Sequence, residues 1–191
     1  MTEVRPNHFD KKPANPSQIR SVDVVIVGGG IAGKACSLGM AQLGLQTLEI
    51  APDLGQTVPS PQGSQWGQRI YAFSPSTQAL LAHLQVWDAI DHARLQVVRD
   101  MRIYGDRGEK NDHLHLSAFE AGTPQLAWIG ESNLIEHTLD QAARFQNKLE
   151  RISDHVEKME VDAEGVTLYL KSGGIIRTQL LIAADGANSP I

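Results

Sequence analysis

The hydrophobic positions between residues 22 and 50 predict a strand, a helix and a second strand in succession. Residues 22–27 form a nearly continuous apolar run with β-branched side chains, which is typical of a buried strand in a parallel sheet. From residue 31 to residue 43, apolar side chains recur at helical spacing. Residues 45–50 predict the second strand, which we expect Glu49 to close. This order is that of a βαβ unit.

Short apolar runs predict further strands at 70–73, 97–104, 113–117, 126–129, 156–161, 166–170, 175–178 and 180–183. Ser74 before Pro75 is typical of a helix N-terminus. Asn133, with Glu136 three residues later, resembles a capping box that opens a helix as far as residue 145. The predicted fold class is α/β, a Rossmann-like βαβ domain with a central parallel sheet, a three-stranded antiparallel meander and part of a second sheet.

Composition narrows the class of protein. The 191 residues are enough for one domain with a core, and 41% are hydrophobic and 20% charged. The net charge of −5 argues against nucleic acid as a partner. No apolar run reaches the roughly 18 residues that span a bilayer. We expect the polar stretch 1–20 to be a flexible tail and 51–67 to be a long loop.

The segment Gly28-Gly29-Gly30-Ile31-Ala32-Gly33 matches G-x-G-x-x-G between the predicted strand and helix. In such a turn Gly28 permits the tight bend, Gly30 lets a pyrophosphate approach the backbone, and Gly33 allows helix and strand to pack closely. The free N–H groups at the helix N-terminus, which Ile31 and Ala32 begin, attract phosphate. A glycine-rich turn without a ligand is the structural alternative.

Glu49 lies about 20 residues beyond the first glycine, where such a site places an acid that binds ribose hydroxyls. An acid there favours a dinucleotide without a 2′-phosphate. The fingerprint leaves FAD and NAD open.

Two further segments carry a family resemblance. Residues 68–74 read Gln-Arg-Ile-Tyr-Ala-Phe-Ser, and residues 181–189 read Leu-Ile-Ala-Ala-Asp-Gly-Ala-Asn-Ser. Together with the glycine fingerprint they resemble the class A FAD-dependent aromatic hydroxylases, and most of all the ubiquinone-biosynthesis hydroxylases. The resemblance extends from residue 22 to the end of the chain and implies FAD as the cofactor.

The resemblance also implies roles for individual residues. The three spaced glycines would hold the FAD pyrophosphate and Glu49 the adenosine ribose. Arg69 would lie near the flavin and its phosphates, Asp185 near the pyrophosphate, and Glu131 would contact FAD from the start of a helix. Each of these last three also has a structural alternative: a surface ion pair for Arg69, a helix N-cap for Asp185 and a simple capped helix at Glu131. No catalytic side chain is nominated and no metal site is expected.

The domains that the resemblance implies are an FAD-binding domain over 21–95 and 125–191 and the beginning of a substrate-binding sheet over 96–124. The implied reaction is hydroxylation of an aromatic ring, such as that of a lipophilic prenylated phenol or quinol, with NAD(P)H as reductant and O₂ as oxidant. The expected location is cytoplasmic, with peripheral association with the inner membrane or with a ubiquinone-biosynthesis complex left open.

Hydroxylases of this family are about twice as long as one domain of this size, and their second half carries further FAD and substrate contacts. We therefore expect the chain to be a fragment or a truncated form that does not hydroxylate alone and binds FAD weakly. Two alternatives stay open: another FAD or NAD oxidoreductase that shares only the fingerprint, and a non-catalytic nucleotide-binding or assembly module.

Overall fold

The computed structural model describes residues 19–52, 54, 67, 69–106, 113–187, 189 and 191. The chain forms two compact units: unit 1 comprises Met1–Thr57 with Ala143–Ile191, and unit 2 comprises Val58–Ala142. Most of the predicted tail and of the predicted loop at 51–67 lies outside the described residues. The boundaries of these two units differ from those of the predicted FAD-binding domain and substrate-binding sheet, and that division into functional domains stays a prediction.

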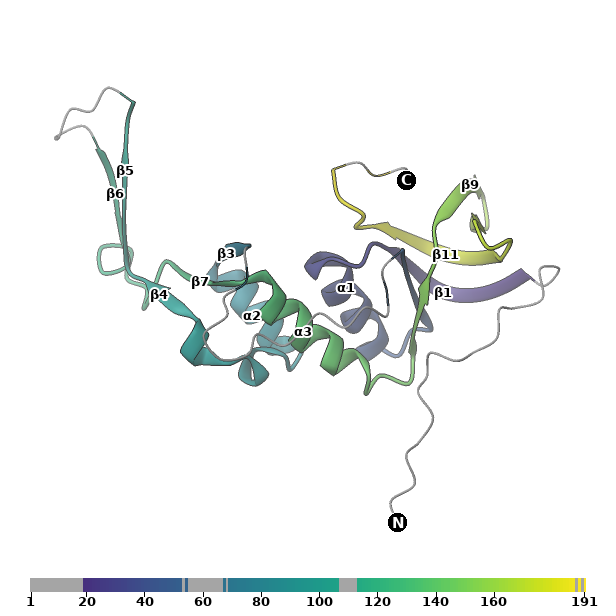
Figure 1. The fold of residues 1–191 in the computed structure, drawn as a ribbon, viewed down its shortest axis with the longest axis horizontal. Helices are drawn as coiled ribbons and strands as arrows, with labels where there is room; N and C mark the ends of the chain where they lie inside the picture. The colour runs from purple at the N-terminus through teal and green to yellow at the C-terminus, as the bar shows by residue number, and fades with distance from the viewer. Residues whose placement is uncertain are drawn as a thin grey trace, which may run out of the picture. The chain divides into compact units, whose positions relative to one another are not determined.

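Unit 1 is built on a six-stranded sheet with the order β8-β2-β1-β11-β10-β9. Its strands are β1 (Ile19–Val27), β2 (Thr47–Ala51), β8 (Leu149–Ser153), β9 (Val156–Asp162), β10 (Gly165–Leu170) and β11 (Ile175–Ala183). The first four in spatial order run parallel, and β9, β10 and β11 form an antiparallel meander. Figure 1 shows β1 and β11 side by side in this sheet. The predicted α/β class, with its parallel sheet and meander, is confirmed.

One face of this sheet carries an apolar cluster that includes Val25, Leu48, Leu168 and Ile176. Helix α1 (Ile31–Gln42) buries other residues, among them Leu38, and packs against β1, β2 and β8. Because successive side chains of a strand point to opposite faces, α1 covers the face opposite the cluster. The predicted βαβ unit is therefore present, with its helix within one residue of the predicted bounds.

Two strand predictions in unit 1 are corrected by the structure. The runs 175–178 and 180–183 form one strand, β11, because its ladder with β1 continues across the exposed Gln179. Strand β8 carries Glu150 and Arg151 in its centre and was missed, because its pattern is not that of a hydrophobic strand.

Unit 2 contains a three-stranded antiparallel sheet and a separate hairpin. The sheet has the order β3-β7-β4, with β3 (Ile70–Phe73), β4 (Gln96–Val98) and β7 (Ala127–Glu131). The helices are α2 (Pro75–His83) and α3 (Ser132–Ala143), with single 3₁₀ turns at Trp87–Ala89 and His92–Arg94. Ser74 caps α2 as predicted, because its hydroxyl accepts a hydrogen bond from the Thr77 N–H.

The hairpin consists of β5 (Asp100–Tyr104) and β6 (His113–Ser117). It carries exposed apolar side chains on one face, where Met101 lies opposite Leu116 and Ile103 opposite Leu114. The single strand predicted at 97–104 is thus two strands, β4 and β5, in different sheets.

The predicted capping box at Asn133 is wrong. Strand β7 leads directly into α3, which begins at Ser132, so Asn133 already lies inside the helix. Its Oδ1 atom is buried and accepts no hydrogen bond from any described residue. In the described ranges, no helix has the length and apolar character needed to cross a membrane, and no group of three or more metal-ligating side chains is found.

Candidate cofactor site

The glycine turn lies where β1 ends and α1 begins, between the ends of the two neighbouring strands. The Gly28 N–H donates to the Ile50 carbonyl of β2 at 2.8 Å, and the Ala184 N–H donates to the Val27 carbonyl at 2.7 Å. Ala184 directly follows β11. The turn is therefore held at the carboxyl ends of the parallel strands, where open α/β sheets bind nucleotides.

Two glycines of the fingerprint are required by close packing. Gly28 is buried and has φ = +126°, and a Cβ atom there would overlap the carbonyl oxygen of Ala184. A Cβ atom on Gly33 would overlap the carbonyl oxygen of Gly28. A larger residue at Gly28 would push the turn away from the backbone that follows β11, and one at Gly33 would push α1 away from the turn, in agreement with the roles predicted for these glycines.

Gly30 differs from these two glycines because it lies beside open space. It is exposed, and a Cβ atom there would have no described heavy atom within 4 Å. Gly30 is the N-cap of α1 and, as a glycine, has no side chain to accept a capping hydrogen bond from the first turn. The N–H groups of the first turn, including those of Ile31 and Ala32, therefore have no partner within the helix. This is the geometry that accommodates a phosphate.

Asp185 lies directly beside this turn. Its backbone nitrogen is within 2.7 Å of the place that a Cβ atom of Gly28 would occupy. The Oδ2 atom of Asp185 is buried and accepts no hydrogen bond from the described residues. A buried carboxylate oxygen without a hydrogen-bond partner costs stability, so a ligand that donates a hydrogen bond to it would be favoured here. Asp185 thus lies beside the glycine turn, and its contact with the FAD pyrophosphate stays a prediction.

Glu49 lies two residues before the end of β2, so the prediction that it closes the strand is wrong. Ile50 and Ala51 continue the ladder with β8. The carboxylate of Glu49 is 1% exposed and is paired with Arg151, whose Nε lies 2.9 Å from Oε2. The contact of Glu49 with a ribose stays a prediction, and this burial leaves little surface for it.

Arg69 and Glu131 belong to unit 2. Arg69 is exposed and directly precedes β3, and among the described residues it forms no ion pair. Glu131 is the last residue of β7 and not part of a helix; its carboxylate is 1% exposed and lies 2.6 Å from Nη2 of Arg94. Their contacts with FAD stay predictions.

The two arginines that engage these carboxylates were missed by sequence reasoning. Arg151 is 102 residues from Glu49, and Arg94 is 37 residues from Glu131. No local motif links residues at such separations. For Arg151 the only local signal was its place between Leu149 and Ile152 in β8, and the polar turn that contains Arg94 carried no such signal.

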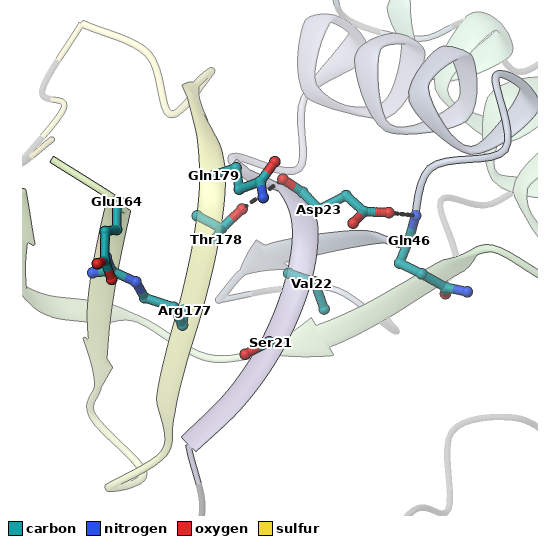
Figure 2. A pocket seen from close by; sticks show the side chains of 8 residues that line it. All are labelled: Ser21, Val22, Asp23, Gln46, Glu164, Arg177, Thr178 and Gln179. Carbon is teal, nitrogen blue, oxygen red and sulfur yellow. Dashed lines mark hydrogen bonds between the residues drawn. The ribbon is translucent and has the colours of Figure 1, made fainter.

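A pocket of about 270 Å³ lies in unit 1 along the first half of β1, away from the glycine turn that follows the strand's last residue. Figure 2 shows its lining, in which Thr178 Oγ1 donates to the carbonyl oxygen of Asp23 at 2.9 Å. The Asp23 carboxylate accepts from the Gln46 N–H at 2.7 Å. These polar groups tie neighbouring strands together, so the pocket is not assigned to the cofactor.

The sequence profile of a family described as FAD binding domain matches residues 21–191. The chain belongs to this family of FAD-binding domains. FAD is therefore the dinucleotide of this chain, and the open choice between FAD and NAD is resolved. The contact of the glycine turn with FAD stays a prediction. The open space at Gly30 and the unpartnered oxygen of Asp185 fit such a ligand.

Curated relatives of this FAD-binding domain are hydroxylases of ubiquinone biosynthesis. The 3-demethoxyubiquinol 3-hydroxylase of Escherichia coli (strain K12) is 32% identical over 170 residues, covering 88% of this chain and 42% of the relative. The mitochondrial ubiquinone biosynthesis monooxygenase COQ6 of Caenorhabditis elegans is 31% identical over 183 residues, covering 88% of this chain and 39% of the relative. The chain thus spans about two-fifths of the length of these relatives.

Solved structures of the same fold include flavin-dependent monooxygenases. The p-nitrophenol 4-monooxygenase PnpA from Pseudomonas putida DLL-E4 superposes with a TM-score of 0.69 at 23% identity, covering 90% of this chain and 43% of PnpA. The flavin-dependent monooxygenase PieE, solved with FAD and substrate, gives a TM-score of 0.65 at 19% identity, covering 88% of this chain and 31% of PieE. At these identities the likeness establishes the fold.

Proposed function

We propose that this chain is the FAD-binding part of a monooxygenase that hydroxylates an aromatic ring in ubiquinone biosynthesis. The relatives named above support this reaction class, since one is named a 3-demethoxyubiquinol 3-hydroxylase and the other a ubiquinone biosynthesis monooxygenase. The substrate of the whole protein would be a lipophilic phenol or quinol with a prenyl chain. Its co-substrates would be NAD(P)H and O₂.

The observation that carries the proposal is the pairing of an open backbone cradle with an unpartnered carboxylate. Within the described residues, Gly30 faces open space at the N-terminus of α1, and the buried Oδ2 atom of Asp185 beside Gly28 has no hydrogen-bond partner. A dinucleotide supplies both missing partners, because its pyrophosphate accepts from N–H groups and its hydroxyls donate to carboxylates.

The contribution of the chain to the reaction is to hold and orient the cofactor. Bound FAD supplies the electron transfer and the activation of oxygen, which side chains cannot perform. The first-turn N–H groups of α1 bind the pyrophosphate, and Asp185 accepts from a hydroxyl of the cofactor. Arg69, a planar cation, would pair with phosphate oxygens of FAD, and this assignment rests on the family resemblance.

The hairpin β5–β6 is the proposed beginning of the substrate-binding sheet. Its four exposed apolar side chains, Met101, Ile103, Leu114 and Leu116, form the kind of surface that contacts a lipophilic molecule. A prenylated substrate partitions into bilayers, so peripheral association with the inner membrane is part of the same proposal. Sedimentation with lipid vesicles checks this last point.

FAD titration of the purified chain, followed by amide chemical shifts in NMR spectra, tests the proposed site. We expect shifts at residues 28–33 and 184–186, and this measurement remains informative when affinity is weak. Shifts spread evenly over the surface, or none at high FAD concentration, would contradict it.

The reaction is tested with a protein that carries this chain at the length of its relatives. Oxygen-dependent formation of a hydroxylated quinol from NAD(P)H is the expected result. Specific binding of a partner protein without any flavin turnover would instead favour an assembly module.

A further inference from the structure

Glu131 and Arg94 form a buried ion pair in unit 2. The Arg94 side chain is 9% exposed and that of Glu131 is 1% exposed. Both Nε, at 2.8 Å, and Nη2, at 2.6 Å, of the guanidinium contact the same carboxylate oxygen, Oε1. Arg94 thus fixes Oε1 and leaves the second oxygen, Oε2, directed elsewhere.

The second oxygen of Glu131 binds the backbone that leads into Arg69. The N–H of Gly67, two residues before Arg69, donates to Oε2. One residue beyond Glu131, the Ser132 N–H donates to the carbonyl oxygen of Arg69 at 2.9 Å. Glu131 also lies opposite Ile70 in the β3–β7 ladder. Arg69 is therefore bracketed by contacts with the end of β7 and the start of α3.

Close packing reinforces this bracket. A Cβ atom on Gly67 would come within 2.6 Å of Oδ1 of Asn133, in the first turn of α3. The backbone at Gly67 therefore lies directly against that helix, with no space for a side chain between them. This contact and the hydrogen bond to Glu131 act on the same residue.

We propose that Glu131 and Arg94 are positioning residues that hold the backbone of Arg69 in place for its contact with FAD. We call this series of contacts the clamp. It runs from Arg94 to the carboxylate of Glu131, from there to Gly67, and so to Arg69. The 1% exposure of the Glu131 side chain favours this positioning role over a direct contact with the cofactor. The proposal rests on the proposed function in one respect, namely that Arg69 contacts FAD.

The pairing explains why these two residue types are needed. An arginine presents Nε–H and Nη–H in a fixed fork and can direct two donors at one carboxylate, whereas lysine is a point charge. Removal of Arg94 alone would leave a buried charge without its counter-ion, which is strongly destabilising. Removal of both charges avoids that penalty, so a double variant keeps the fold available for measurement.

Amide hydrogen exchange in the chain without FAD tests the clamp directly. The variants are Arg94→Met, Glu131→Gln and the double variant R94M/E131Q, with Arg20→Met as the matched control because Arg20 pairs with Glu150 in unit 1. We expect the Gly67 and Ser132 amides to exchange about tenfold faster in R94M and several-fold faster in the other two, because local opening then costs less. Amides of β10 and β11 should keep their protection.

FAD affinity in a double-mutant cycle tests the action through Arg69. We expect Arg69→Ala to weaken binding about tenfold, in keeping with the loss of a charge-assisted contact. E131Q should weaken binding when Arg69 is present and have no further effect in the R69A background, because a residue that acts through Arg69 has nothing to position once Arg69 is gone.

The outcomes separate the clamp from the proposed function. Unchanged exchange at Gly67 and Ser132 in all three variants would overturn the clamp. Additive effects of E131Q and R69A on affinity would overturn the action through Arg69 and assign Glu131 a direct contact. If the original chain, without substitutions, binds no FAD, the proposed function fails. The exchange data still decide whether the clamp exists.

Discussion

Glu49 on β2 and Arg151 on β8 face each other across adjacent parallel strands, with Nε of the arginine 2.9 Å from the carboxylate. Both are largely buried, at 1% and 13% side-chain exposure. The acid that was predicted to bind a ribose also joins two strands of the sheet. Burial of both charges makes each depend on the other.

Arg151→Met should therefore destabilise the chain by about 3–5 kcal/mol, because it leaves Glu49 buried without its counter-ion. The double variant E49M/R151M should be more stable than R151M, since it removes both charges. Urea denaturation measures the free energies of unfolding. Arg20→Met is the control: its pair with Glu150 is about one-third exposed on both sides, so we expect a loss below about 1 kcal/mol. Equal losses in R151M and R20M would contradict the argument.

Gly30→Ala separates ligand binding from folding. The backbone at Gly30 has φ = −79°, which alanine adopts without strain, and no described atom would meet the new methyl group. We expect stability within about 1 kcal/mol of the original chain and FAD binding weakened at least tenfold, because the methyl group occupies the space of the pyrophosphate. Gly44→Ala is the matched control. At φ = +87° it should lose stability but keep its affinity for FAD.

The parts of the fold that were predictable are those with local signals. Helix α1 and strand β3 were placed within one residue because glycines, a Ser-Pro cap and the hydrophobic spacing mark their ends in the sequence itself. Strand β11 was divided at Gln179 because its continuity depends on the ladder with β1, more than 150 residues away.

For the candidate site too, only the parts marked by local sequence signals were predictable. The cradle at Gly28–Gly33 and the position of Asp185 follow from short motifs. The partners of Glu49 and Glu131 do not, because Arg151 and Arg94 come close to them only when the chain has folded. A glutamate at the expected spacing was interpreted as a ligand, and only the three-dimensional structure reveals its internal partner.

Asp162 gives a stability contribution that depends on pH. The hydrogen bonds from Arg177 lower the pKa of this carboxyl from 3.8 to about 2, with help from the Glu164 N–H. Because the folded pKa lies below the unfolded one, the contribution is present above about pH 4 and is lost as the pH falls through about 2.

The melting temperature of Asp162→Asn, compared with that of the original chain, checks this dependence. The difference should be constant above about pH 5 and should shrink toward zero between pH 4 and pH 2. Asp88→Asn is the control, because Asp88 is exposed and has no ion pair among the described residues. A difference for D162N that grows as the pH falls would contradict the assigned direction.

The side chain of Asp185 should lower the stability of the chain without FAD and raise its affinity for FAD. Its Oδ2 atom is buried without a partner in the described residues, and leaving such an oxygen unsatisfied costs about 1–3 kcal/mol. Asp185→Ala removes this cost, so we expect the free energy of unfolding to stay the same or to rise, while FAD binding falls at least tenfold. Denaturation without FAD and NMR titration with FAD measure the two quantities.

Asp185→Asn keeps the size of the side chain but removes its charge, and it should lose affinity for FAD as well if the charge is what binds. A large loss of stability in D185A would contradict the argument and show instead that the side chain of Asp185 serves the fold.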